Sequence, residues 1–322
     1  MRKSHLVILA VLSVLIAGVA AAVWTGSRPS VGPCADGASA AGLKTYRAQT
    51  GDGNCLQGYV WEPANTPARG VLVVVHGLHD HAQRYAGLAG QLSAAGIAVL
   101  AQDHRGHAGS GGQRQRLDSI EQVMGDIDLA LKEAAKRYPN TPLFLYGHSM
   151  GGLAVAHYAT KPTSPLAGLV VSSGALKLPP DVNGVKVRIV QTLSALAPGM
   201  GLEAIDEANV VREAVARADL AADPLIVREK VPARTAATLL TGIAKIQEQM
   251  QEIKTPLLIL HGQRDRVTEV DGSRDLLARA AVKDKSLKLY ESALHDLLHE
   301  PEGKQVAQEI LAFIDGRLPA RK

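Results

Sequence analysis

Aromatic residues are scarce in this chain, and a long run of one charge is missing. Phenylalanine, tryptophan and tyrosine make up 3% of the 322 residues, so alanine, leucine and valine must fill most of a core. The 35 basic and 31 acidic residues, a formal net charge of +4, are mixed along the chain. Proteins that bind nucleic acid carry a concentrated basic patch, so the sequence predicts no such partner.

Charged residues are absent from one apolar stretch, residues 6–23, which follows Arg2 and Lys3. A basic start before such a run is typical of an export signal. The run is nearly long enough to cross a bilayer, which takes about 20 residues, while residues 20–22 are all alanine and offer a small-residue cleavage site. A cleaved signal peptide and a membrane anchor both remain open, with a buried soluble helix as the alternative. Either export reading places the rest of the chain outside the cytoplasm.

Cysteine occurs only twice, at Cys34 and Cys55. An export signal favours a disulfide between them, because disulfides persist in oxidising compartments. Closing that loop would add ~3 kcal/mol of stability by chain entropy. Two free thiols are the alternative. Residues 24–42, rich in Gly, Ser, Ala and Pro, are predicted to be a linker to a domain that covers residues 43–322.

From residue 43 onward, short apolar runs alternate with helical stretches. The predicted strands are residues 43–49, 57–63, 70–77, 97–103, 143–149, 167–173, 256–262 and 286–291. The predicted helices are residues 82–95, 117–137, 151–159, 272–281 and 302–316. Continuous Val/Ile/Leu runs suit strands that are covered on both faces. We therefore expect an α/β fold with a mostly parallel sheet of about eight strands, flanked by helices, whose first two strands could pair antiparallel.

Residues 177–254 interrupt this alternation, because they contain no convincing strand. Two apolar stripes at helical spacing occur there: Leu239, Ile243, Ile246, Met250 and Ile253, and the shorter Val187, Val190, Leu193 and Ala197. Such stripes are most often plain core contacts. A helical insertion at one edge of a sheet is nevertheless where a lid over a site would lie.

The sequence "GHSMG" at residues 147–151 has the form G-x-S-x-G, between a predicted strand and a predicted helix. In that context Ser149 is predicted to lie on a strained turn with its hydroxyl exposed above the sheet. The flanking glycines leave room where backbones pass closely. A tight turn without chemistry is the alternative.

A serine hydroxyl needs a base, and the base needs an orienting carboxylate. On this fold both should follow the serine, the acid first and the histidine last. Asp265 follows the strand predicted at 256–262, and His295 follows the last predicted strand. The weaker candidates are Glu269, Asp271 and His299. The sequence therefore predicts Ser149, Asp265 and His295 as the catalytic residues.

Two backbone N–H groups must stabilise the oxyanion of such a reaction. Leu78 follows the end of the strand predicted at 70–77, and Met150 follows the nucleophile, so we expect their N–H groups to form this site. Nearby lie His76, His79, His81, His104 and His107. They lack the spacings typical of zinc sites, so we predict no metal and expect them to form hydrogen bonds around the oxyanion loop.

Together these motifs resemble the monoacylglycerol lipase group of serine hydrolases, which includes lysophospholipases. The likeness covers most of residues 43–315 and rests on "HGLHDHAQRY", "DHRGHAGSGG", "GHSMGG", "DPLIVRE", "HGQRDRV" and "LHDLLHE", which follow one another in the family's order. The resemblance implies the α/β-hydrolase fold, the three catalytic residues above, and a lid within residues 177–254. It also implies that the lid forms an apolar mouth that can lie against a membrane.

The predicted activity is hydrolysis of a carboxylic ester of a single-chain lipid, a monoacylglycerol or lysophospholipid, through an acyl-enzyme and without a cofactor. A general carboxylesterase that acts on short soluble esters is the nearest alternative. An aminopeptidase is possible on fold alone. A catalytically silent binding protein is the alternative of another class, but it offers no reason for nucleophile, acid, base and oxyanion loop to occur together.

Overall fold

The computed structural model describes residue 34 and residues 43–162, 166–202 and 206–319. The apolar run at residues 6–23, and the predicted linker apart from Cys34, lie outside the described residues. Among the helices that are described, none combines the length and the apolar character needed to cross a membrane.

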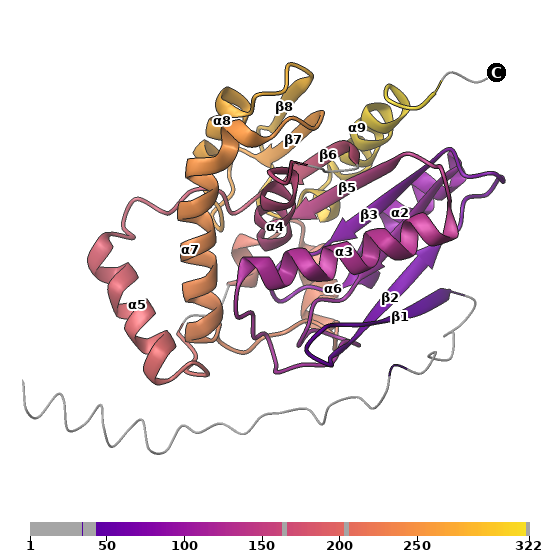
Figure 1. The fold of residues 1–322 in the computed structure, drawn as a ribbon. Coiled ribbons are helices and arrows are strands. Elements are labelled where there is room, and N and C mark those ends of the chain that lie inside the picture. Colours follow the sequence, from indigo (N-terminus) through magenta and orange to yellow (C-terminus); the bar gives the residue numbers. More distant parts are fainter. Residues whose placement is uncertain (1–33, 35–42, 163–165, 203–205, 320–322) are drawn as a thin grey trace, which may run out of the picture.

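Eight strands form one sheet in the order β1-β2-β4-β3-β5-β6-β7-β8 (Figure 1). Their bounds are Lys44–Gln49, Cys55–Trp61, Gly70–Val75, Ile97–Gln102, Leu143–His148, Leu166–Ser172, Leu257–Gly262 and Lys285–Tyr290 for β1 to β8. β2 runs antiparallel to both β1 and β4, and all other neighbours are parallel. The predicted mostly parallel sheet, with its antiparallel start, is confirmed.

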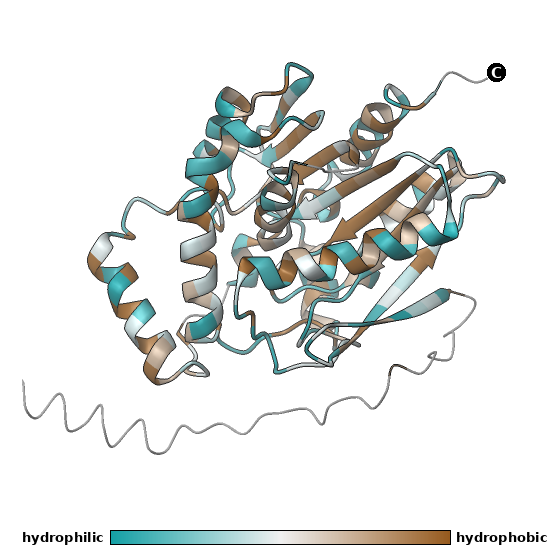
Figure 2. Cartoon of the chain, viewed as in Figure 1, coloured by the Kyte–Doolittle hydropathy of each residue, from teal (hydrophilic) through white to brown (hydrophobic). Residues whose placement is uncertain are grey.

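The central strands are apolar along their whole length because helices cover both faces of the sheet. Every residue of β3, β4 and β5 is buried, and β3 and β5 are largely brown in Figure 2. The edge strand β8 instead alternates exposed and half-buried positions over most of its length. This contrast is what a sheet enclosed between two layers of helices requires.

Helices on the two faces belong to separate core clusters. On one face, α3 (Ile120–Arg137), α4 (Met150–Ala159) and α8 (Val270–Arg279) contribute to one cluster. On the other, α2 (Ala86–Ala94), which follows the 3₁₀ turn η1 (Ala82–Tyr85), and α9 (Gly303–Asp315) contribute to the second. The fold is thus a three-layer α/β sandwich whose parallel strands all end at one edge, where loops gather.

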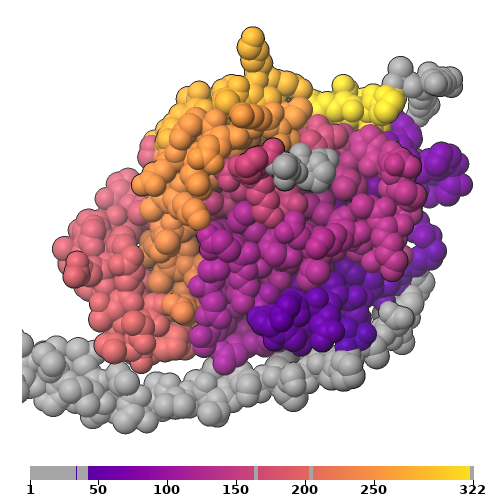
Figure 3. Space-filling view, viewed as in Figure 1, coloured from indigo at the N-terminus to yellow at the C-terminus, as the bar shows by residue number. Residues whose placement is uncertain are grey.

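The insertion between β6 and β7 is helical. It contains α5 (Gly184–Leu196), η2 (Glu207–Asn209), α6 (Ala214–Ala222), α7 (Ala233–Gln249) and η3 (Met250–Glu252). Within its described part, the extended pairing is limited to one bridge between Gly201 and Pro232. Ile243, Ile246, Met250 and Ile253 are buried in the core, as their spacing predicts. By contrast α5 packs on α7 and projects as a lobe away from the sheet (Figures 1 and 3).

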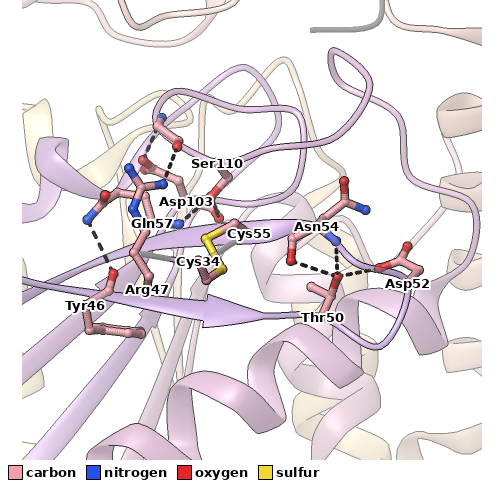
Figure 4. The surroundings of a disulfide bond; sticks show 11 residues. Cys34, Tyr46, Arg47, Thr50, Asp52, Asn54, Cys55, Gln57, Asp103 and Ser110 are labelled. Carbon is pink, nitrogen blue, oxygen red and sulfur yellow. Dashed lines mark hydrogen bonds between the residues drawn. A yellow bond between two sulfur atoms is a disulfide. The ribbon is translucent and has the colours of Figure 1, made fainter. Parts of the chain in front are cut away.

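A disulfide joins Cys34 to Cys55, the first residue of β2, with the two Cα atoms 5.5 Å apart (Figure 4). Beside it, the Thr50 hydroxyl accepts a hydrogen bond from the Asn54 amide at 2.9 Å and closes the turn between β1 and β2. The disulfide therefore ties residue 34 to the antiparallel side of the sheet.

Candidate active site

Ser149 stands between β5 and α4 in a backbone conformation that side chains rarely adopt. Its φ is 56° and its ψ is −117°. The Ser149 amide donates a hydrogen bond to the Ser172 carbonyl of β6 at 3.0 Å, and its carbonyl accepts from the Leu153 amide at 3.1 Å. Such strain persists only where the surroundings enforce it, which is common at reactive residues. The sharp turn predicted around "GHSMG" is present.

The neighbouring glycines provide clearance for this turn. A Cβ atom at Gly147 would lie 2.3 Å from the Gly151 carbonyl oxygen, and one at Gly151 would lie 2.2 Å from the Val75 carbonyl oxygen. Both distances are far below van der Waals contact with rigid backbone. Strand, turn and helix therefore approach this closely only because both positions are glycine.

Asp265 and His295 meet although 30 residues separate them. The Nδ1–H of His295 donates to Asp265 Oδ2 at 2.8 Å. The other carboxylate oxygen accepts from the amides of Val267 at 2.7 Å and Thr268 at 3.0 Å, and the Thr268 hydroxyl donates to Oδ2 at 2.9 Å. A proton on Nδ1 leaves Nε2 of His295 as the basic nitrogen.

Electrostatics keep this pair in the protonation states that a base requires. Burial favours a raised pKa for Asp265, but the charge of His295 and hydrogen bonds from His261 and His295 lower it well below its usual value. Burial favours a lowered pKa for His295, but the nearby Asp265 charge outweighs this and the pKa is raised. Asp265 is therefore ionised, and His295 is a stronger base than a free histidine.

Ser149 and His295 line the same small cavity, of about 50 Å³, at the carboxyl edge of the sheet. Leu78 also lines it, and the ring of His148 lies 4.7 Å from that of His295, centroid to centroid. Met150 is the first residue of α4, whose N-terminal amides lack partners within the helix. The structure thus brings Leu78, Ser149 and His295 together at one cavity, with Asp265 bonded to His295 and Met150 directly after Ser149.

The weaker candidates lie elsewhere. Asp271 is exposed at the start of α8 and pairs with Arg274 at 2.6 Å, and Glu269 directly precedes that helix. His299 Nδ1 donates to Asp296 at 2.8 Å instead of to Asp265. Among these acids and histidines, the described structure places the His295 ring against Asp265.

A buried charge network also lines the cavity. Arg84 lies between Asp80 at 3.1 Å and Asp296 at 2.8 Å, and the Tyr85 hydroxyl donates to Asp80 at 3.0 Å. Burial favours a raised pKa for Asp296, but His299 and Arg84 lower it well below its usual value. The sequence motifs contain both residues but do not predict that they pair, because Arg84 and Asp296 are 212 residues apart. The sequence signal for this network was the presence of charged residues inside the two motifs that flank the predicted site.

Three of the histidines near the oxyanion loop, His76, His104 and His107, form hydrogen bonds with the backbone through their rings. His76 Nδ1 donates to the Gly77 carbonyl at 2.7 Å, and its Nε2 accepts from the His104 amide at 2.9 Å. His104 Nε2 donates to the His76 carbonyl at 3.0 Å, and His107 Nδ1 donates to the Arg105 carbonyl at 3.0 Å. Within the described residues, no group of His, Cys, Asp or Glu side chains is arranged to hold a metal ion. These hydrogen bonds hold the loop after β3 against the loop after β4.

Comparison with known proteins matches this geometry to a family. The model of the serine aminopeptidase S33 hydrolases matches residues 66–302. The chain belongs to this family. It is 36% identical over 259 residues to a monoacylglycerol lipase of Mycolicibacterium smegmatis, covering 80% of this chain and 92% of the relative. It is 32% identical over 269 residues to the monoglyceride lipase of Homo sapiens, and the match covers 83% of this chain and 88% of the human protein.

Two solved lipase structures share the architecture. The monoacylglycerol lipase of Paleococcus ferrophilus superposes with a TM-score of 0.73 at 30% identity, over 85% of this chain and 99% of the other. The monoglyceride lipase of Saccharomyces cerevisiae superposes with a TM-score of 0.76 over 89% of this chain and 99% of the other. Because the two sequences are 22% identical, this second likeness shows the fold alone. The predicted α/β-hydrolase fold and the resemblance to monoacylglycerol lipases are confirmed.

Proposed function

We propose that this S33 hydrolase cleaves the ester bond of a single-chain lipid, a monoacylglycerol, with Ser149 as the nucleophile. One observation carries the proposal: a strained serine and a histidine held by a buried carboxylate line one cavity. The lipase names of the relatives favour a carboxylic ester hydrolase acting on lipids. They weigh against an esterase of short soluble esters, an aminopeptidase and a silent binding protein.

In the proposed mechanism, Nε2 of His295 takes the Ser149 proton as the hydroxyl attacks the ester carbonyl. The N–H groups of Leu78 and Met150 hold the oxyanion. His295 then protonates the departing alcohol, and a water molecule repeats the sequence on the acyl-enzyme. Asp265 stays ionised throughout and holds the imidazole with its proton on Nδ1.

The exposed apolar side chains of the projecting helix α5 favour a substrate that comes from a lipid membrane. Val185, Ile189 and Leu196 of α5 are 69%, 53% and 70% exposed. Large apolar side chains exposed together on one projecting helix mark an interaction surface. We call these three residues the apolar lid face and propose that it rests on a membrane. We further propose that residues 6–23 direct the domain across the cytoplasmic membrane, which suits the disulfide at Cys34.

Substitution of the nucleophile tests the proposed reaction. Purified wild-type protein should react with a fluorophosphonate at Ser149, and S149A should lose both labelling and at least about 10³-fold of the hydrolysis rate while keeping its melting temperature. A panel of monoacylglycerols, lysophosphatidylcholine, p-nitrophenyl acetate and an amino-acid p-nitroanilide should show the highest kcat/KM for a monoacylglycerol. Retained turnover in S149A, or a preference for the acetyl ester or the anilide, would contradict the proposal.

A further inference from the structure

The lid insertion contacts the histidine loop through its backbone. The carbonyl oxygen of Val210, directly after η2, accepts hydrogen bonds from the amides of His295 at 3.1 Å and Asp296 at 2.9 Å. Val210 also lines the cavity together with Ser149. The backbone that carries the proposed base is thus fastened to the insertion.

Two residues further on, Arg212 strengthens this attachment. Its amide donates to Glu300 Oε1 at 2.9 Å and its Nε–H donates to Glu300 Oε2 at 2.7 Å. The Glu300 side chain is fully buried, and its Oε1 also lies 3.3 Å from the Leu294 amide, directly before His295. Glu300 therefore links Arg212 to both ends of the histidine loop.

The outer contact of Arg212 is of a different kind. Its Nη2 group donates to both oxygens of Glu302, at 2.5 and 2.6 Å, but the Glu302 side chain is 24% exposed against 0% for Glu300. A carboxylate in contact with water loses little when its partner is removed, whereas a buried one is left uncompensated. Glu302 therefore provides a matched control for Glu300.

A second segment of the insertion holds the oxyanion loop in the same way. The Val227 amide donates to the His79 carbonyl at 3.0 Å, and His81 Nε2 lies 2.9 Å from Asp223 Oδ2. Both loops that carry proposed reaction groups are thus bonded to the base of the lid. The base is part of the scaffold of the site, in contrast to the projecting α5.

We infer that Arg212 and Glu300 are positioning residues for His295: they lock the lid segment at Val210 onto the histidine loop and so fix the imidazole against Ser149. The inference rests on the proposed function. A misplacement of about 1 Å in a reacting group can cost ~10²-fold in rate. Loss of the lock should therefore lower kcat on every substrate, whereas loss of a lid contact that serves lipid binding alone would raise KM on lipids.

The experiment compares R212M, R212K and E302Q with the wild type, using p-nitrophenyl butyrate and monooleoylglycerol. R212M should lower kcat at least about tenfold on both substrates, with KM within about threefold. R212K, which keeps the charge but not the fork of donors, should recover part of kcat. E302Q should behave as wild type. Amide hydrogen exchange of the peptide that contains His295 and Asp296 should speed up in R212M and not in E302Q.

Two outcomes would overturn the inference: wild-type kcat and exchange in R212M, or a loss confined to monooleoylglycerol or to KM. Should R212M not fold, E300Q carries the same expectations with a side chain of equal shape. Absence of turnover in the wild type would contradict the proposed function instead, and the exchange measurement would then still decide whether Arg212 locks the loop.

Discussion

Asp265 shows how a single carboxylate can be held ionised inside a protein. Its side chain is wholly buried, yet it accepts hydrogen bonds from two backbone amides, from the Thr268 hydroxyl and from His295. Each donor favours the charged form, and together they outweigh the cost of burial. The same charge raises the pKa of His295, which links the rate to pH.

Replacement of Asp265 tests this link. In the wild type, kcat/KM should fall as pH drops through the raised pKa of His295, above about 6.5, because the protonated imidazole cannot act as a base. D265N should lower kcat by about 10⁴-fold through loss of the correct tautomer. It should also move the acidic limb of the pH profile to lower pH. D271N, at an exposed acid of α8, is the control and should leave the rate unchanged; a larger loss in D271N than in D265N would refute the assignment.

At the scale of elements, helix α5 carries two sets of apolar residues that differ in their exposure to solvent. Val187, Val190 and Leu193 are half-buried on this helix, which packs on α7. Val185, Ile189 and Leu196 point to solvent. The spacing of apolar residues identified the inner stripe alone, because a helix with apolar residues on both sides shows no sign of which side meets the protein.

Polar substitution on the apolar lid face tests its proposed role. V185S/L196S should lower the rate on monooleoylglycerol in phospholipid vesicles by at least about tenfold, since the two lost apolar contacts with lipid are together worth ~2–4 kcal/mol at most. The rate on soluble p-nitrophenyl butyrate should not change. Q191S, on an exposed polar position of the same helix, is the matched control. Equal losses on both substrates would show that the face supports folding rather than a lipid surface.

At the scale of the whole molecule, buried histidines make stability depend on pH. Burial is the largest cause that lowers the pKa of His76 well below its usual value, of His104 to about 4 and of His107 to about 3. Between pH 6.5 and about 4, the unfolded chain binds protons at these residues and the folded chain does not. Stability therefore decreases as pH falls through this range. His295 and His299, whose pKa values are raised, oppose this only at and above their unfolded values.

Chemical denaturation at pH 7, 6, 5 and 4.5 measures the effect. Each buried neutral histidine should remove about 1.4 kcal/mol from the free energy of unfolding for every pH unit below 6. H107N keeps a donor for the Arg105 carbonyl and removes one titrating group. As pH is lowered, its free energy of unfolding should therefore decrease by about 1.4 kcal/mol less per pH unit than that of the wild type. Parallel pH dependence in H107N and wild type would show that His107 is already protonated in the folded protein.

The order of strands and helices could be predicted because each element is specified by the residues of its own short segment. Apolar runs such as residues 70–75 and 143–146 are typical of strands covered on both sides, and the turn at Ser149 needs glycine on each side of it. Ser149, Asp265 and His295 could be selected because each follows a predicted strand, and parallel strands end at one edge of a sheet. The sequence by itself therefore determined the sheet, the family and the candidates for the chemistry.

Only the tertiary structure decided which charges meet and which parts of the lid hold the site. Arg84 reaches Asp296 across 212 residues, and Arg212 reaches Glu300 across 88. Such pairs follow no periodicity, because they depend on where loops arrive after the sheet has closed. The structure likewise separated the lid into a base bonded to the catalytic loops and a projecting α5. The physical reason is that apolar patterning acts within each element, whereas the partner of a buried charge is set by the packing of all of them.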